Sequence, residues 1–186
     1  MYKLFLILSL TILPIYTYYA PSKDGRFTHF TDIGQGFPIL LVPPCPTEAA
    51  FYQPNQKGLE KHFRVIAIDL FGFGFSSQRG ITGQEIPLSA YAEQIKDVLD
   101  YLGIKKAVIG GESLGGMIAL EFLYLYPEYI SGMILSDTDA DPETEEGKVT
   151  GKEWADMLLS KNGLEKWMNW FLPLAFPNKV DRKSVV

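Results

Sequence analysis

One short segment, Gly111-Glu112-Ser113-Leu114-Gly115-Gly116, constrains the fold of this chain more than any other. It follows a short apolar run at residues 107–110 and opens a helical run that starts at Leu114. A G-x-S-x-G motif between a buried strand and a helix predicts a sharp turn that presents the serine above a sheet. In so tight a turn, side chains two positions either side of the serine would collide, so glycine is needed at 111 and 115. The motif therefore identifies Ser113 as a candidate nucleophile.

The apolar runs along the chain predict a sheet that is mostly parallel. Runs at residues 38–42, 65–69, 107–110 and 133–136 show no polar alternation, which is typical of strands buried on both faces. Two β-rich runs, residues 15–19 and 26–33, flank an Asp-Gly turn and predict a hairpin. Helical spacing appears at residues 91–102, with Ser89 as N-cap, and at 114–126 before Pro127. Strands that alternate with helices indicate an α/β, doubly wound fold.

Composition excludes several classes of function. The net charge of −5 and the lack of a basic run argue against nucleic-acid binding. With one cysteine, Cys45, and two histidines, we expect no internal disulfide, no metal and no cofactor. Gly72-Phe73-Gly74 lacks the third glycine of a dinucleotide motif and no Gly-Lys-Ser/Thr follows, so we interpret these glycines as turn residues.

Over roughly residues 17–176 the chain resembles the α/β-hydrolase family, because several of its motifs occur in the order in which that family has them. Asp69-Leu70-Phe71-Gly72-Phe73-Gly74-Phe75-Ser76 is similar to the family's D-x-x-G-x-G-x-S turn after the fourth strand. The segment at residues 91–95 resembles the helix before the nucleophile strand, and residues 126–135 resemble the run into the sixth strand. The resemblance implies a serine hydrolase whose sheet is incomplete at the C-terminus and is followed by the start of a helical lid.

The resemblance also implies a triad in the order serine, acid, histidine, and this chain has no histidine after Ser113. We interpret His29 and His62 as structural or surface residues. Asp137, at the end of the sixth strand, is a candidate acid, and the alternative is that it caps or solvates its loop. A serine without an imidazole base is a weak nucleophile at neutral pH. We therefore expect the isolated chain to be inactive and to be a fragment of a longer protein.

The expected oxyanion hole is formed by the N–H groups of Cys45 and Leu114. In the family, His-Gly follows the third strand and the next residue donates its N–H; here that place reads Pro43-Pro44-Cys45. Proline has no N–H, but the matching donor is Cys45. We interpret the Cys45 thiol as a neighbour of the pocket, since nothing nearby in the sequence lowers its pKa.

Two functional hypotheses follow. In the first, Ser113 attacks an ester-like carbonyl of a small apolar acyl substrate. A serine at this position argues against the epoxide hydrolase and haloalkane dehalogenase branches, which by resemblance use aspartate there. In the second, favoured by the missing histidine and by Pro43-Pro44, the chain is a non-catalytic hydrolase-like binding protein or a decayed gene product. The sequence does not identify the substrate or the oligomeric state.

We expect three segments: a hydrophobic leader at 1–14, the hydrolase core at 15–147 and a partial helical cap at 148–186. The leader contains the apolar run Leu4 to Leu13 after one cation, which fits either a secretory signal or an uncleaved anchor. The first predicts secretion, the second membrane association, and a non-functional leader predicts a cytoplasmic protein. In the cap, Trp154 and Met157 and then Trp167 and Phe171 recur at helical spacing, predicting two short helices that end near Pro173. The two helices either form a lid, or their apolar faces simply pack against other parts of the protein.

Overall fold

The computed structural model describes residues 17–78, 86–140 and 145–175. The chain divides into two compact units, Met1–Ala140 and Asp141–Val186. The first unit contains all six described strands, and the second contains two helices. The expected boundary between residues 147 and 148 falls inside the first of these two helices.

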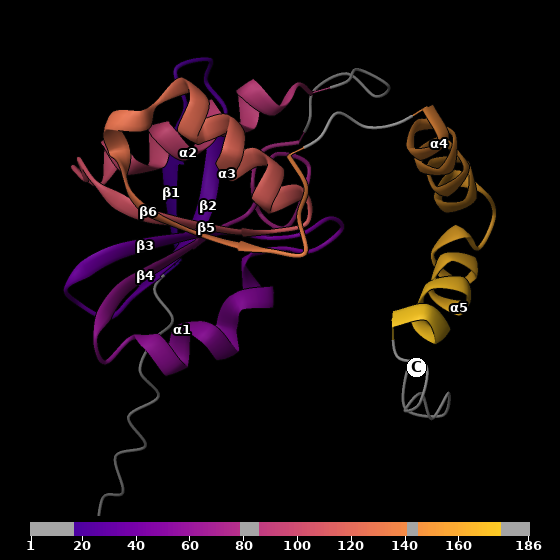
Figure 1. The fold of residues 1–186 in the computed structure, drawn as a ribbon, viewed down its shortest axis with the longest axis horizontal. Coiled ribbons are helices and arrows are strands. Elements are labelled where there is room, and N and C mark those ends of the chain that lie inside the picture. Colours follow the sequence, from indigo (N-terminus) through magenta and orange to yellow (C-terminus); the bar gives the residue numbers. More distant parts are fainter. Residues whose placement is uncertain (1–16, 79–85, 141–144, 176–186) are drawn as a thin grey trace, which may run out of the picture. The chain divides into compact units, whose positions relative to one another are not determined.

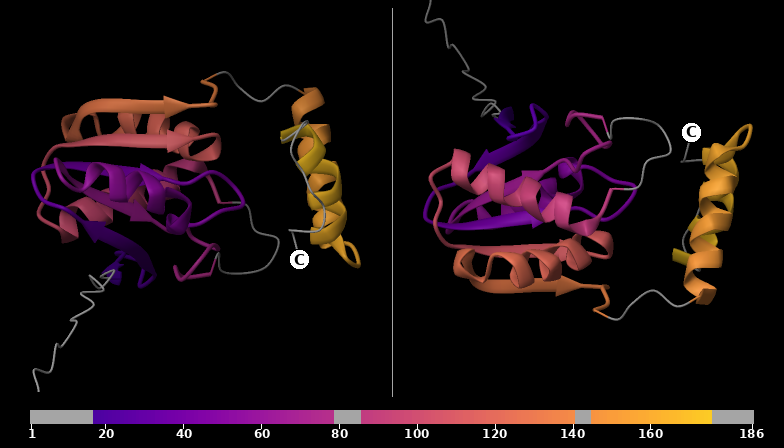
Figure 2. Two further views of the ribbon diagram at one scale, coloured as in Figure 1. Left: turned by 90° about the horizontal axis from the view of Figure 1, so that it is seen from below. Right: turned by 90° about the horizontal axis from the view of Figure 1, so that it is seen from above.

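The first unit is built on a mostly parallel sheet, which confirms the predicted fold class. Its strand order is β1-β2-β4-β3-β5-β6, so β1 and β6 form the two edges (Figure 2). Strands β3, β4, β5 and β6 are parallel to one another, whereas β1 and β2 are antiparallel to their neighbours. The strands are β1 Thr17–Pro21, β2 Phe27–Ile33, β3 Phe37–Val42, β4 Phe63–Ile68, β5 Ala107–Glu112 and β6 Ile130–Ser136. Because parallel strands run in the same direction, the loops that follow β3, β4, β5 and β6 all lie at the carboxyl end of these strands.

Helices cover both faces of this sheet (Figure 1). A 3₁₀ turn, η1 (Ala49–Tyr52), leads into α1 (Gln53–Leu59) on one face. On the other face lie α2 (Leu88–Tyr101) and α3 (Leu114–Leu125), and a second 3₁₀ turn, η2 (Pro127–Tyr129), precedes β6. Because successive side chains of a strand point to opposite faces of the sheet, the strands contribute residues to two separate hydrophobic cores.

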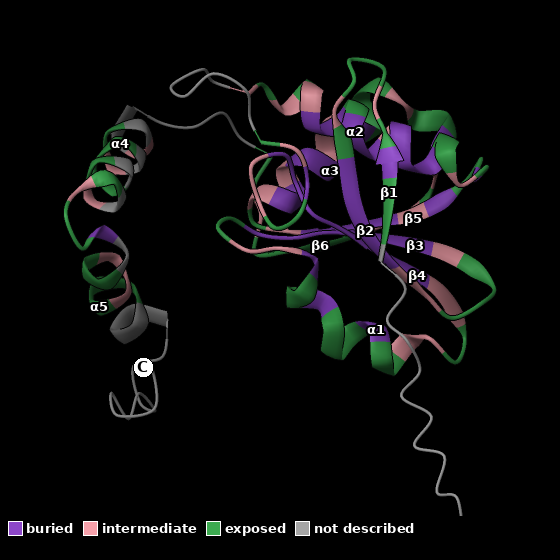
Figure 3. Cartoon of the chain, turned by 180° about the vertical axis from the view of Figure 1, so that it is seen from behind, coloured by how far each residue is buried: buried purple, intermediate pink, exposed green. Residues whose placement is uncertain are grey.

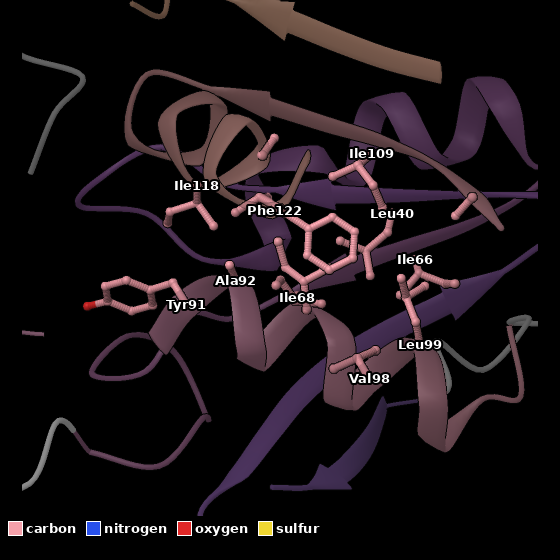
Figure 4. Close-up of a cluster of buried hydrophobic side chains, with 14 of the residues drawn as sticks. Leu40, Ile66, Ile68, Tyr91, Ala92, Val98, Leu99, Ile109, Ile118 and Phe122 are labelled. Atoms are coloured by element: carbon pink, nitrogen blue, oxygen red, sulfur yellow. The ribbon is translucent and has the colours of Figure 1, made fainter. Parts of the chain in front are cut away.

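The larger core lies between the sheet and helices α2 and α3. Leu40 and Val42 of β3 and Ile66 and Ile68 of β4 point to this side, where Phe122 of α3 is fully buried (Figure 4). The alternate residues of the same strands pack with Ala49 and Tyr52 on the α1 side. Burial on both faces explains why these strands show no polar alternation in the sequence (Figure 3).

Two helix boundaries differ from those predicted. Ser89 is not the N-cap of α2: the helix begins at Leu88, with the extended Pro87 as its N-cap residue and no side-chain capping bond. The short helix α1 was not predicted, because Gln53-Pro54-Asn55-Gln56-Lys57-Gly58-Leu59 contains proline, asparagine and glycine, all weak helix formers. Its Gln56 is nevertheless buried and donates to Thr31 Oγ1 at 2.8 Å.

The second unit consists of α4 (Glu145–Leu159) and α5 (Gly163–Ala175). The helix α4 includes Glu145 and Glu146, the last two residues of the acidic segment 137–146. The helix α5 continues through Pro173, although a proline cannot donate a backbone hydrogen bond. The two helices are joined by aromatic contacts: the Trp154 and Trp170 rings lie 5.3 Å apart, and both side chains remain about 40% exposed.

The predicted leader, Leu4 to Leu13, lies outside the described residues. Within residues 17–78, 86–140 and 145–175, none of the helices combines the length and the apolar character that a bilayer crossing requires.

A hydrogen-bonded group formed by Lys96 and Asp100 of α2 and Tyr129 of η2 makes a pH-dependent contribution to stability. Lys96 Nζ lies 2.5 Å from Asp100 Oδ2, and the Tyr129 hydroxyl donates to Asp100 Oδ1 at 2.7 Å. Lys96 first and Tyr129 second hold the pKa of the Asp100 carboxyl below its usual value of 3.8. A depressed folded-state pKa contributes stability that is present above the unfolded pKa and is lost as the pH falls through the folded pKa.

We therefore expect Asp100→Asn to lower the free energy of unfolding at neutral pH and to have no effect in strong acid. Because the carboxylate is partly exposed, the neutral-pH loss is about 0.5 kcal/mol. Urea unfolding at several pH values measures it. Glu93→Gln, on the same helix, is the matched control, since Glu93 and Lys23 are exposed and 4.0 Å apart. A loss in Asp100→Asn that is the same at every pH contradicts this account.

Candidate active site

Ser113 lies in the sharp turn between β5 and α3. Its backbone has φ 51° and ψ −121°, a left-handed conformation that non-glycine residues rarely adopt. The turn is held by its main chain: Ser113 N–H donates to Ser136 O at 3.1 Å, and Ser113 O accepts from Gly116 N at 2.9 Å and Met117 N at 3.1 Å. The residue is exposed and stands at the N-terminus of α3, where the helix dipole favours negative charge.

Glycines 111 and 115 are required by close backbone contacts. A Cβ on Gly111 would lie 2.1 Å from Gly115 O, and a Cβ on Gly115 would lie 2.1 Å from Val42 O. Gly116 faces a side chain instead: a Cβ there would be 2.5 Å from atoms of Thr138. The start of α3 thus lies directly against the end of β3, and this contact brings the β3 loop close to Ser113.

The loop after β3 carries Cys45. Thr47 donates from both its backbone N and its Oγ1 to Pro44 O, at 2.8 and 2.7 Å, and the Cys45–Pro46 peptide is cis. Cys45 is exposed. Leu114 is the first residue of α3, so its N–H has no carbonyl to bond within the helix. These are the two positions at which the sequence places the oxyanion donors.

The end of β6 also reaches this turn. Ser136 O bonds to Ser113 N, so Asp137 is next to a residue in direct contact with the turn; Asp137 is exposed and has φ 42°. Thr138 donates from Oγ1 to Ser113 O at 2.8 Å. Thr138 was not predicted as part of the site, because nothing in the residues around it marks a threonine that contacts another segment.

The two histidines lie away from Ser113. His29 is buried on β2, and its Nδ1 is 2.7 Å from Asp69 Oδ2. Three strand spacings separate β2 from β5, which is roughly 14 Å at about 4.8 Å each. His62 is exposed and directly precedes β4, so it lies at the amino end of the parallel strands, whereas Ser113 lies at their carboxyl end. Neither ring can act on the Ser113 hydroxyl in this arrangement.

Two further features lie at the end of β3 and at the loop that follows it. The Tyr52 hydroxyl donates to Val42 O at 3.0 Å, and burial, followed by the charge of Glu112, raises the pKa of Tyr52 to about 12. A hollow of about 370 Å³ lies between the loops after β3 and β4. Its wall consists of Pro46, Thr47, Glu48, Ala50, Phe51, Phe73 and Gly74. In the described part of the chain, no group of three or more His, Cys, Asp or Glu side chains is placed to hold a metal ion.

A six-stranded sheet in this order, with a left-handed serine between its fifth strand and the next helix, defines an α/β protein of hydrolase type. The model of the alpha/beta hydrolase fold family matches residues 38–170, and the chain belongs to that family. This confirms the resemblance inferred from the motifs.

The similar proteins include several that are named as hydrolases or esterases. A 2-hydroxymuconate semialdehyde hydrolase of Pseudomonas putida is 36% identical over 118 residues, which is 60% of this chain and 40% of that protein. Haloalkane dehalogenase 2 of Mycobacterium tuberculosis is 32% identical over 117 residues, 63% of this chain and 40% of that protein. A thermophilic esterase of Thermogutta terrifontis is 32% identical with a TM-score of 0.70, covering 77% of this chain and 53% of that one. The chain thus spans about half the length of these relatives or less.

Proposed function

We propose that this chain carries the nucleophile of a serine hydrolase that acts on an ester-like carbonyl of a small apolar acyl substrate. The observation that carries the proposal is the left-handed Ser113, exposed at the N-terminus of α3 and supported by glycines that tolerate no Cβ. A turn of this kind is strained, and strained backbone is kept where the surrounding structure and function require it. The esterase and hydrolase relatives support the reaction class.

In the proposed reaction, Ser113 Oγ bonds to the carbonyl carbon while a base takes the hydroxyl proton. The oxyanion accepts hydrogen bonds from the N–H groups of Leu114 and Cys45. The bond to the leaving group then breaks, the leaving group takes the proton, and water hydrolyses the acyl-serine to release the acid. The proposal requires an imidazole base that residues 114–186 do not supply, and Asp137 is our candidate for the acid that orients it.

The serine at position 113 also favours the reaction of some relatives over that of others. If dehalogenases of this family use aspartate at the nucleophile position, as the resemblance implies, then Ser113 separates this chain from them and groups it with the esterases. Acyl transfer to water is therefore favoured over halide displacement.

Covalent labelling tests the proposal. We expect a fluorophosphonate probe to modify the 186-residue chain at Ser113, slowly alone and at least severalfold faster when imidazole is added as the missing base. Intact mass and peptide mapping locate the adduct. Ser113→Ala should abolish labelling, whereas Ser89→Ala, which removes an exposed serine inside a regular helix, should not change it. Labelling that persists in Ser113→Ala contradicts the assignment.

A second function, non-catalytic binding of a small apolar ligand, is favoured by one observation. Both histidines occupy places from which they cannot reach Ser113, and His29 is already bonded to Asp69. If native chain remains unlabelled even with imidazole, the oxyanion site is not organised for acyl transfer and the binding function is preferred.

A further inference from the structure

The buried carboxylate of Asp69 is bonded to three separate segments of the chain. Asp69 is 1% exposed and immediately follows β4. Its Oδ1 accepts from Ala49 N at 2.7 Å, and its Oδ2 accepts from Phe75 N at 2.8 Å and lies 2.7 Å from His29 Nδ1. Hydrogen bonds to a carboxylate are roughly twice as strong as neutral ones, and burial strengthens them further.

Two of these bonds reach the loop after β3, which carries Cys45, and the loop after β4. Ala49 begins η1, directly after the loop that carries Cys45, and Phe75 belongs to the loop after β4. The hollow of about 370 Å³ lies between these same two loops. The Asp69 side chain is therefore bonded to both of the loops that form the wall of the hollow.

The chain packs closely around the Asp69 carboxylate. A Cβ on Gly74 would lie 2.1 Å from Asp69 Oδ2, so the β4 loop already lies against it. The backbone of Asp69 is fixed as well, because its carbonyl accepts from Ser76 Oγ at 2.7 Å and from Gln94 Nε2 at 2.9 Å. His29 is held from the other side, since its N–H donates to Ser76 Oγ at 2.8 Å.

We propose that Asp69 is a positioning residue: by binding Ala49 N–H and Phe75 N–H together, it sets the position of the Cys45 loop relative to Ser113. This inference rests on the proposed function, in which the Cys45 N–H binds the oxyanion. Misplacing a group that acts on the transition state by about 1 Å costs roughly 10²-fold in rate. The hydrogen bond from the Cys45 N–H forms only to the oxyanion, so the affinity for the substrate in its ground state should be unaffected.

Asp69→Asn tests the inference, because an amide has one acceptor atom where the carboxylate has two. Whichever way the amide turns, its NH₂ group faces either the Ala49 N–H or the Phe75 N–H. We expect faster amide hydrogen exchange confined to one of the loops, residues 43–52 or 70–77, with β3 and β5 still protected. Asp32→Asn is the matched control: it makes the same change on β2, where Asp32 binds Arg64 and contacts neither loop.

The second readout is the labelling of Ser113 by the fluorophosphonate in the presence of imidazole. In Asp69→Asn we expect the maximal inactivation rate to fall roughly 10- to 100-fold while the probe concentration for half-maximal rate stays the same. A residue that only stabilises the fold would not separate these two constants. Asp32→Asn should match the native chain in both.

The outcomes are distinct. Loop exchange that is unchanged in folded Asp69→Asn, or that rises equally across the sheet, overturns the inference. If Asp69→Asn does not fold, exchange in the native chain decides: the amides of Ala49 and Phe75, which bond to Asp69, should exchange as slowly as the amides of β4. Fast exchange at either amide overturns the inference. If the native chain itself is not labelled, the proposed function fails, and the exchange result alone decides whether Asp69 positions the loops.

Discussion

Replacing Gly115 by alanine is expected to destabilise the first unit by roughly 3–5 kcal/mol, a large share of the stability of a domain of this size. The added Cβ would stand 2.1 Å from Val42 O and 2.9 Å from Pro43 O. Both are backbone atoms at the end of β3, so no side chain can rotate away to make room. The start of α3 would have to move off the sheet, and that movement breaks the contact that holds the Cys45 loop close to Ser113.

Gly58→Ala is the matched control for this change. Gly58 lies in α1 with nothing within 4 Å of the position of its Cβ, and it is exposed. An alanine in an exposed helix is favoured over glycine by about 0.5–1 kcal/mol, so this variant should be as stable as the native chain or slightly more stable. Urea unfolding followed by circular dichroism compares the two. A Gly115→Ala chain that unfolds at the native urea concentration contradicts the geometry of the turn.

Local sequence was sufficient for those parts of the structure that depend on local rules. The apolar runs became β3, β4, β5 and β6, and the Asp24-Gly25 turn joins β1 to β2 as predicted. The first three of these strands are largely buried, whereas the prediction of burial on both faces is wrong for the edge strand β6, where Ile134 and Leu135 are exposed. The serine turn was also readable, since strand, G-x-S-x-G and helix follow one another directly. In each case the sequence signal lies within a run of a few residues.

The parts that escaped prediction are determined by contacts between distant segments. Thr138 reaches Ser113 across 25 residues, and Asp69 joins segments that lie 20 and 40 residues away. The helix α1 forms despite poor helix formers because Gln56 and Tyr52 are bonded to β2, β4 and β3. A sequence read in windows contains no signal for such pairings, because the same residue types are common in exposed loops.

Gln94 shows the energetic side of the same point. It sits within the apolar stripe of α2, is 1% exposed, and has hydrogen bonds from both ends of its amide. Its Nε2 donates to Thr28 Oγ1 at 3.0 Å and to Asp69 O at 2.9 Å, and its Oε1 accepts from Phe71 N at 3.2 Å. The side chain therefore joins α2 to β2 and to the loop after β4.

Gln94→Leu is expected to lower the free energy of unfolding by about 2–4 kcal/mol, although leucine is the more hydrophobic residue and fits a buried helix face. The change leaves the buried Phe71 N–H without an acceptor and removes a donor from Asp69 O, and each buried polar group left unpaired costs about 1–3 kcal/mol. Gln53→Leu makes the same substitution at an exposed position of α1 and should stay within about 0.5 kcal/mol of the native chain. Equal urea midpoints for the two variants would show that burial of the leucine offsets the lost bonds. A drop limited to Gln94→Leu means that hydrogen bonding, rather than apolar packing, determines how α2 is attached to the Asp69 loop.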